Sequence, residues 1–281
     1  MRCDTHVHIV GPIGRYPQLP SRTYLAGVAP LDELRSRGAE RGVARFVIVQ
    51  ASFYGADNTL LLESLDILGP NGRGVAVIDP TAAPKATLAE FARRGVRGLR
   101  LNLYSTAAGR EVKQIDGLFA PLADIAATMG WHVEVIASID LLLAAADVLA
   151  RSAVPVVIDH YGVYGRATPQ SEAGRRLLEL LALPNVWVKL SAPYRVSDDP
   201  FATRPDPAWL AAIVKAAPGR CVWGSDWPHT PHQSLHGDAE TPLPYRPLSY
   251  TALVDDFLAA LSNAELVQAI MTDNPARLYD F

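Results

Sequence analysis

The sequence predicts a (β/α)8 barrel, a single α/β domain over residues 1–281. Short apolar runs alternate eight times with longer amphipathic segments, as strands and helices do in repeated parallel β-α units. The length is close to the roughly 250 residues of such barrels, and no linker, repeat or low-complexity segment divides the chain. An open doubly wound sheet would need a glycine-rich phosphate turn after its first strand. Pro12 and Pro17 stand there instead, so the barrel is favoured.

Local sequence patterns place each element. Residues 46–49 and 156–158 are apolar without interruption, as strands covered on both faces require. Three helical segments end just before Gly42, Gly95 and Gly130, where a left-handed cap fits. The strands are expected at residues 2–10, 45–52, 74–79, 98–103, 131–136, 155–160, 186–191 and 221–226. The helices are expected at residues 31–41, 57–68, 85–94, 117–129, 139–151, 172–183, 207–217, 250–261 and 264–271.

Composition and charge narrow the classes of function. A net charge of −3 without a basic block argues against nucleic acid or a membrane surface as the main partner. No apolar run approaches the ~20 residues of a membrane span. The first strand begins near Met1, which leaves no room for a signal peptide, and Cys3 and Cys221 suit buried thiols in a reducing compartment. We expect a cytoplasmic protein whose partner is a small molecule, and the pattern is compatible with a homo-oligomer.

Polar side chains end nearly every predicted strand. The carboxyl ends of barrel strands converge, so these residues become neighbours although they are far apart in the sequence. The alternation of a strand would turn Asp4, His6 and His8 to the same face, and two imidazoles in one space suit a site that binds a metal, moves protons or polarises a carbonyl. The other strand ends carry Gln50 and Ser52, Arg100 and Asn102, Glu134, Asp159 and His160, Lys189 and Ser191 with Arg195 just beyond, and Ser225 and Asp226.

Each of these residues also has a structural explanation. Asp226 could cap a turn, and His160 could be a hydrogen-bonded core histidine. Arg100 could be a salt-bridged barrel residue, and Arg195 could be a solvated loop charge. Lys189 could pair with Glu134 inside the barrel. Buried charges are costly unless they are paired or used. Because so many converge on one rim, we expect an active site there.

The combination of motifs resembles a known family. His6-x-His8, Asp159-His160 and the run GSDWP at residues 224–228 are similar to the amidohydrolase superfamily, metal-dependent or related hydrolases on a (β/α)8 barrel. Further motifs resemble the 2-pyrone-4,6-dicarboxylate lactonase group within it. These are RY at 15–16, VQAS at 49–52 with Gly55-x-Asp57-Asn58, RGLRLN at 97–102, GWHV at 130–133, VKLS at 188–191, GSDWPH at 224–229 and DNPARL at 273–278. The likeness runs from Asp4 to Tyr279.

The resemblance implies that His6, His8, His160 and Asp226 surround a lactone carbonyl. Asp226 would take a proton from water and so make a nucleophile. The three histidines would donate hydrogen bonds to the oxygen that becomes negative as water adds.

The resemblance also implies that Arg100 and Arg195 hold substrate carboxylates, which a planar guanidinium binds in bidentate fashion. Further substrate contacts are expected at Tyr16, Ser52, Tyr54 and Asn102. Ile136 stands where the pyrone-dicarboxylate enzyme carries a polar aromatic residue, which points to a different lactone.

The sequence departs from the metal-dependent pattern of the superfamily. Such enzymes normally add a lysine or glutamate on the fourth strand, or a histidine on the fifth. The corresponding residues 100–102 and 133–136 supply neither. We therefore favour a reaction without a metal. A mononuclear Zn²⁺ or Mn²⁺ would nevertheless find three ligands in His6, His8 and Asp226.

The expected reaction is the hydrolysis of a small carboxylated lactone, similar to 2-pyrone-4,6-dicarboxylate, in aromatic catabolism. Sugar-acid lactone hydrolysis, lactone isomerisation and decarboxylation of an aromatic acid could use the same histidine and aspartate set. A binding protein on a retained barrel is disfavoured, because Asp226 and all three histidines are present together.

Overall fold

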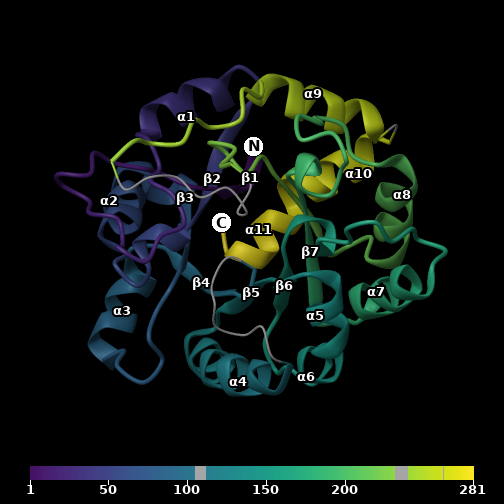
Figure 1. The fold of residues 1–281 in the computed structure, drawn as a ribbon, viewed down its shortest axis with the longest axis horizontal. Helices are drawn as coiled ribbons and strands as arrows, with labels where there is room; N and C mark the ends of the chain where they lie inside the picture. The colour runs from purple at the N-terminus through teal and green to yellow at the C-terminus, as the bar shows by residue number, and fades with distance from the viewer. Residues whose placement is uncertain (105–111, 232–239, 262) are drawn as a thin grey trace.

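A computed structural model describes residues 1–104, 112–231, 240–261 and 263–281 of the chain. Eight parallel strands run in the order β1 to β8 around a barrel, and helices form a ring outside it (Figure 1). The ring of strands closes where Asp226 N donates to His6 O at 2.9 Å and His8 N donates to Trp227 O at 2.8 Å. The predicted (β/α)8 barrel is therefore confirmed, and its closure lies at the predicted site.

The strands are β1 (Arg2–Val7), β2 (Val43–Val49), β3 (Gly72–Ala76), β4 (Val96–Asn102), β5 (His132–Ile136), β6 (Val156–Ile158), β7 (Val186–Ser191) and β8 (Cys221–Gly224). The α-helices are α1 (Leu31–Ala39), α2 (Thr59–Leu68), α3 (Lys85–Arg93), α4 (Val112–Met129), α5 (Ile139–Ala144), α6 (Ala146–Ala150), α7 (Glu172–Ala182), α8 (Pro207–Ala216), α9 (Tyr250–Ala260), α10 (Ala264–Gln268) and α11 (Asn274–Tyr279). Short turns of other helical types are η1 (Ser52–Tyr54), η2 (Gly69–Asn71), η3 (His160–Gly162), η4 (Pro193–Arg195) and the π turn η5 (Ala269–Asp273).

The elements differ from the sequence prediction mainly at their ends. β1, β6 and β8 stop earlier than expected, so the polar residues after them lie on turns. The helix expected at 139–151 is two helices, α5 and α6, because Ala145 between them has a ψ of 0°. The helix expected at 264–271 is α10, which ends at Gln268. The π turn η5 follows it directly and leads into α11, a helix that was not predicted from the sequence.

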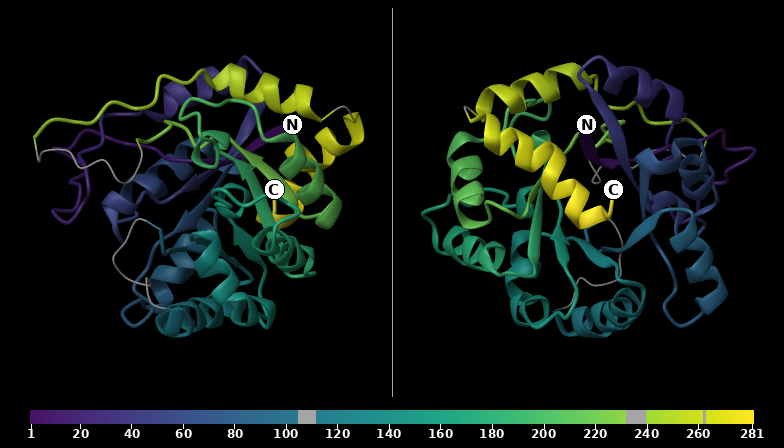
Figure 2. Two further views of the ribbon diagram at one scale, coloured as in Figure 1. Left: turned by 45° about the vertical axis from the view of Figure 1, so that its right-hand side comes forward. Right: turned by 180° about the vertical axis from the view of Figure 1, so that it is seen from behind.

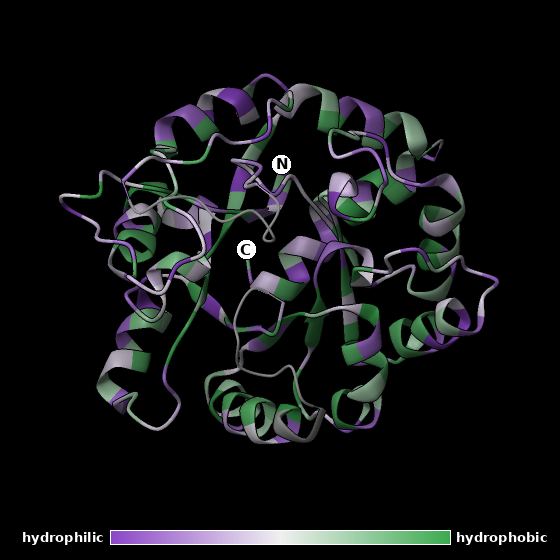
Figure 3. Cartoon of the chain, in the orientation of Figure 1, coloured by the Kyte–Doolittle hydropathy of each residue, from purple (hydrophilic) through white to green (hydrophobic). Residues whose placement is uncertain are grey.

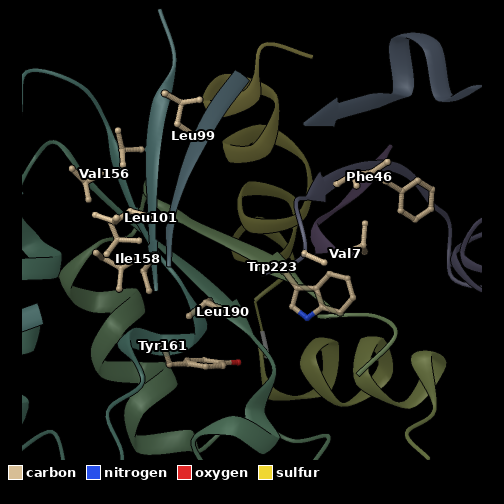
Figure 4. Close-up of a cluster of buried hydrophobic side chains, with 14 of the residues drawn as sticks. Val7, Phe46, Leu99, Leu101, Val156, Ile158, Tyr161, Leu190 and Trp223 are labelled. Carbon is tan, nitrogen blue, oxygen red and sulfur yellow. The ribbon is translucent and has the colours of Figure 1, made fainter. Parts of the chain in front are cut away.

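Apolar side chains of the described residues form a larger layer and a smaller layer of two clusters, which share Leu278 as a neighbour. The larger layer lies between the strands and the surrounding helices and includes Phe46, Leu99, Leu190 and Trp223 (Figure 4). Coloured by hydropathy, the strands are largely hydrophobic and the outer loops largely hydrophilic (Figure 3). In the described part of the chain, no helix is long and apolar enough to cross a membrane.

The smaller layer closes the amino end of the barrel. Helix α11 crosses this end in the view from behind (Figure 2, right). Its Tyr279 packs with Cys3, Val47 and Val75, and its ring lies edge-on to the ring of His132 at 5.2 Å. The opposite, carboxyl end is left for the polar residues.

Candidate active site

A pocket lies at the carboxyl end of the barrel, where the polar strand ends meet. His8, Arg100, His160, Arg195 and Asp226 all line it, although they come from five different strand ends. Its remaining lining residues are Thr23, Tyr24, Ala51, Ser52, Phe53, Asn102, Ile136 and Thr230. The structure thus brings together five predicted catalytic or carboxylate-binding groups and Ser52 and Asn102, two of the expected substrate contacts.

His6 does not line the pocket, but it meets the lining residues His8 and Asp226 at the base of the pocket. Asp226 Oδ1 lies 3.6 Å from His6 Nε2 and 3.5 Å from His8 Nε2. His6 Nε2 and Asp226 Oδ1 are buried and make no hydrogen bond within the described residues. His8 Nδ1 donates to Val49 O at 2.8 Å, so in the neutral form of the ring the lone pair is on Nε2, the nitrogen that faces Asp226.

Asp4 does not share this space, and the expectation that it faces the same way as the two histidines is wrong. The pairing of β1 with β2 shifts register between Asp4 and Val7, which interrupts the strict alternation. The Asp4 carboxylate instead accepts hydrogen bonds from Ser225 N at 2.9 Å and from the Tyr250 hydroxyl of α9 at 3.0 Å. It ties β1 to the loop that carries Asp226.

Asp226 is held in a strained, charged environment. Its φ of 60° is rare for a non-glycine residue, and such backbone strain concentrates at functional sites. Its Oδ2 accepts from Arg195 Nε and from the Tyr194 hydroxyl, both at 2.7 Å. Burial raises the pKa of Asp226, but Arg195 and His160 outweigh it and hold the pKa well below its usual range. Asp226 is therefore a carboxylate at neutral pH.

Arg195 is not the solvated loop charge that was considered from the sequence. Only 8% of its side chain is exposed, and its second nitrogen, Nη2, donates to Thr230 Oγ1 at 2.7 Å. It lines the pocket while pairing with the proposed base. Its position allows both tasks that a guanidinium performs here, binding an anion and holding Asp226 ionised.

His160 is part of the pocket wall rather than of the apolar core. Its φ of 47° turns the chain out of β6, and its Nδ1 lies 2.8 Å from Ser191 Oγ. Burial lowers the pKa of His160 to about 4, although Asp226 acts in the opposite sense. The ring is therefore neutral, and its centroid lies 4.7 Å from that of His6.

A buried ionic cluster lies behind the pocket. The predicted pair of Lys189 and Glu134 is confirmed: the two side chains form an ion pair with no solvent exposure. Lys189 Nζ is also 3.1 Å from His6 Nδ1 and 3.6 Å from Asp159 Oδ1. Burial and then Asp159 raise the pKa of Glu134, while the adjacent Lys189 lowers it and stabilises the carboxylate. Burial and then Lys189 lower the pKa of His6, so its ring is neutral.

The other predicted substrate contacts are divided between the pocket and its surroundings. Arg100 donates to Gln50 O at 2.8 Å and is 4.0 Å from Asp159, so it is partly salt-bridged while still lining the pocket. The Tyr16 hydroxyl donates to Glu63 at 2.5 Å, and the Tyr54 hydroxyl accepts from Gly11 N at 3.2 Å. These two hydroxyls are engaged outside the pocket.

Among polar residues of the site, Thr23, Tyr24 and Thr230 in the pocket wall were not predicted from the sequence, nor was Tyr194, whose hydroxyl donates to Asp226. Tyr194 is adjacent to Arg195 in the loop after the seventh strand, and Thr230 follows the 224–229 motif by one residue. These two residues could have been found from the sequence because each lies directly beside a motif residue. Tyr24 lies in the long loop after β1, and nothing local in the sequence marks it.

Within the described part of the chain, two groups of side chains offer suitable donors for a metal ion. His6, His8 and Asp226 form one group, and His6, Asp159 and His160 form the other, with ligand atoms in each group within 4.8 Å of one another. In the first group, His6 Nε2 and Asp226 Oδ1 are buried atoms that lack a hydrogen-bond partner in the described ranges. By type and position, His6, His8 and Asp226 fit a divalent cation that takes two imidazoles and a carboxylate.

A (β/α)8 barrel with histidines on its first and sixth strand ends and an aspartate after its eighth strand defines a class of hydrolytic enzymes. The family model described as "Amidohydrolase" matches residues 3–281. The chain therefore belongs to the amidohydrolase family.

The names of individual relatives specify particular substrates. A 2-pyrone-4,6-dicarboxylate hydrolase of Comamonas testosteroni is 30% identical, over 98% of this chain and 89% of its own length. A 4-sulfomuconolactone hydrolase of Hydrogenophaga intermedia is 27% identical, over 98% and 88%. The solved structure of a putative 2-pyrone-4,6-dicarboxylic acid hydrolase from Pseudomonas putida has a TM-score of 0.79 and 30% identity, covering 99% of this chain and 97% of that one.

Proposed function

We propose that this protein hydrolyses a small anionic lactone. The observation that carries the proposal is the arrangement at the base of the pocket. His6 Nε2 and Asp226 Oδ1, two buried atoms without partners among the described residues, face each other across 3.6 Å, with two arginines in the wall above. The relatives from Comamonas and Hydrogenophaga, named for a dicarboxylate and a sulfonated lactone, support an anionic lactone as substrate.

Water activation is assigned to Asp226 and His8. Asp226 Oδ1 and His8 Nε2 are both acceptors and lie 3.5 Å apart. One water molecule can donate a hydrogen to each, which turns an oxygen lone pair toward the substrate. Asp226 takes the proton as the water oxygen attacks the lactone carbonyl carbon. The Nδ1–H bond of His8 to Val49 O is why we place His8 with the water rather than with the carbonyl oxygen.

The carbonyl oxygen is assigned to His6 and His160. Both rings are buried and neutral, and N–H donors in a dry site stabilise the negative charge that forms on the oxygen. The tetrahedral species then collapses and the ring C–O bond breaks. The leaving oxygen recovers the proton from Asp226, so that lactone and water give one ring-opened acid.

Substrate binding is assigned to the arginines and to one apolar contact. Arg100 and Arg195 line the pocket on either side of His160, where each can bind an anionic group of the substrate. Ile136 lines the same pocket and offers no hydrogen bond. We infer that the part of the lactone nearest β5 is apolar, and that the preferred substrate differs in this part from 2-pyrone-4,6-dicarboxylate.

We propose that the reaction proceeds without a metal. A divalent cation on His6, His8 and Asp226 would supply a Lewis acid for the carbonyl and a more acidic water. The described residues already supply a base, neutral N–H donors and two guanidinium groups for these tasks.

Cys3 and Cys221 are both free thiols, which supports a reducing compartment such as the cytoplasm.

A panel of carboxylated, sulfonated and sugar-acid lactones, assayed with and without chelator, tests these proposals. We expect turnover with the product heavier by one water and no loss of rate on chelation. An unchanged mass would indicate isomerisation, and loss of CO₂ would indicate decarboxylation. Complete inactivation by chelator would refute the metal-free reaction, and no turnover of any lactone would refute the substrate class.

A further inference from the structure

We infer that Lys189 is a positioning residue that fixes the tautomer of His6 and thereby decides whether His6 acts as a donor or as a metal ligand. The inference rests on the proposed lactone hydrolysis for its catalytic meaning. Its structural content concerns only which nitrogen of the ring carries the hydrogen.

Lys189 enters the barrel from β7 and is fully buried beneath the pocket. It forms an ion pair with Glu134 and lies 3.6 Å from Asp159, so it sits between two carboxylates as an ammonium ion. An ammonium ion has three donors and no acceptor. Its Nζ lies 3.1 Å from His6 Nδ1, so Nδ1 accepts this hydrogen bond and carries no hydrogen.

The single hydrogen of the neutral His6 ring is then on Nε2, which faces Asp226 Oδ1 at 3.6 Å. Asp159 is the competitor for this arrangement. Its Oδ1 lies 3.3 Å from His6 Nδ1 and would accept a hydrogen from it, but Lys189 Nζ is nearer to the same nitrogen at 3.1 Å. The closer Lys189 contact favours the Nε2–H form.

The two forms lead to different chemistry. A metal-bound histidine usually donates its other ring N–H to a carboxylate or carbonyl group, which His8 does toward Val49 O. His6 would need Asp159 as its partner to do the same. With Lys189 in place, His6 presents an N–H to the site instead of a lone pair. Lys189 thus favours a hydrogen-bond donor over a metal ligand at His6.

Nitrogen NMR of protein labelled with ¹⁵N-histidine tests the inference directly, with the His6 signals identified by their loss in His6→Asn. In the unmodified protein we expect an unprotonated Nδ1 and a protonated Nε2 at His6. The reverse pattern would overturn the inference whatever the variants do. In Lys189→Met we expect the hydrogen to move to Nδ1, with Asp159 as its new partner.

Calorimetric titration with Zn²⁺ gives a second measurement. We expect Lys189→Met to bind Zn²⁺ at least tenfold more tightly, because a histidine partner typically alters metal affinity by 10- to 100-fold and Lys189 is a partner that opposes metal binding. Glu134→Gln is the matched control, because it removes a charge from the same cluster and keeps the Lys189 donor. It should retain the tautomer of His6 and change zinc affinity less than threefold.

If Lys189→Met does not fold, the double variant Lys189→Met, Glu134→Gln is used instead in both measurements. It removes both partners of the ion pair, so that neither charge is left unpaired. An unchanged tautomer with unchanged zinc affinity, in a folded variant that lacks Lys189, would overturn the inference. Neither measurement uses a substrate. A failed lactone panel would therefore refute the proposed function and leave the role of Lys189 to be decided separately.

Discussion

His6 at the carboxyl end of the barrel and His132 at its amino end are both fully buried, and both have ring nitrogens without a hydrogen-bond partner among the described residues. Their surroundings differ. His6 Nε2 faces an aspartate carboxylate and lies close to two other imidazoles. His132 lies against the ring of Tyr279, and the backbone of Gly98 lies directly against its ring.

The difference shows that an unpartnered buried histidine is not by itself evidence of function. At the carboxyl end, donors and acceptors from several strands converge on a pocket, so an atom without a partner there can be used by a substrate. At the amino end, α11 covers the same kind of side chain with apolar residues. We therefore expect changes at the carboxyl end to affect turnover, and changes at the amino end to affect stability.

The largest effect is expected for Asp226→Asn. The amide cannot take a proton from water, so kcat should fall by about 10³-fold, within the range for loss of a general base. Steady-state rates and a thermal unfolding curve check this together. Asp140→Asn, on the exposed first turn of α5, is the control and should leave kcat within about twofold. Full activity in Asp226→Asn would remove the central assignment at the carboxyl end.

The two arginines should give the next largest effects, and the effects should differ in kind. Arg100→Met removes an anion contact, so KM should rise tenfold or more, which corresponds to the roughly 1.5–3 kcal/mol of a charge-assisted hydrogen bond. Arg195→Met removes the same kind of contact and the partner of Asp226 at 2.7 Å, so kcat should change as well. Equal affinity for an anionic lactone or its product, measured by calorimetry on both variants, would exclude a role in substrate binding.

The carboxyl end was more accessible to prediction from sequence than the rest of the molecule. A barrel brings its strand ends together, so residue types at those ends identify the members of the site without any knowledge of distances. Prediction of the pair Lys189–Glu134 succeeded for a related reason, since buried charges need partners. Asp4 was misplaced because a register shift in β1 leaves no mark in a single sequence.

Contacts made by long loops could not be predicted. Tyr24 and Thr230 reach the pocket from the segments after β1 and β8, whose paths depend on tertiary packing. Helix α11 was missed because it follows α10 through a π turn and is only six residues long. The hydrogen-bond partners that set His6 and His8 in different tautomers likewise come from other strands, and only the folded structure shows them.

At the amino end, His132→Met should change stability and leave turnover within about twofold. Burial lowers the pKa of His132 to about 3, whereas a histidine in an unfolded chain titrates near 6.5. The stability that depends on the neutral ring is fully present above pH 6.5 and is lost as the pH falls toward 3. Between pH 7 and pH 5 this loss amounts to roughly 2 kcal/mol.

Methionine does not titrate, so urea unfolding at the two pH values should show the variant gaining roughly 2 kcal/mol relative to the unmodified protein on acidification. Other groups titrate in this range in both proteins and cancel in the difference. A loss of turnover at pH 7.5 in a folded His132→Met protein would contradict the division between the two ends.

The smallest effect is expected for Tyr16→Phe, which tests where the carboxyl end stops. The hydroxyl donates to Glu63, a partly exposed carboxylate, so its loss should reduce stability by about 1 kcal/mol or less and change kcat/KM less than threefold. Asn102→Ala, which changes a residue of the pocket wall, should raise KM more than Tyr16→Phe does. If Tyr16→Phe instead lowers kcat/KM tenfold, the loop after β1 must move onto the substrate and bring this hydroxyl with it. The carboxyl end would then include a mobile wall, while the amino end under α11 would remain fixed.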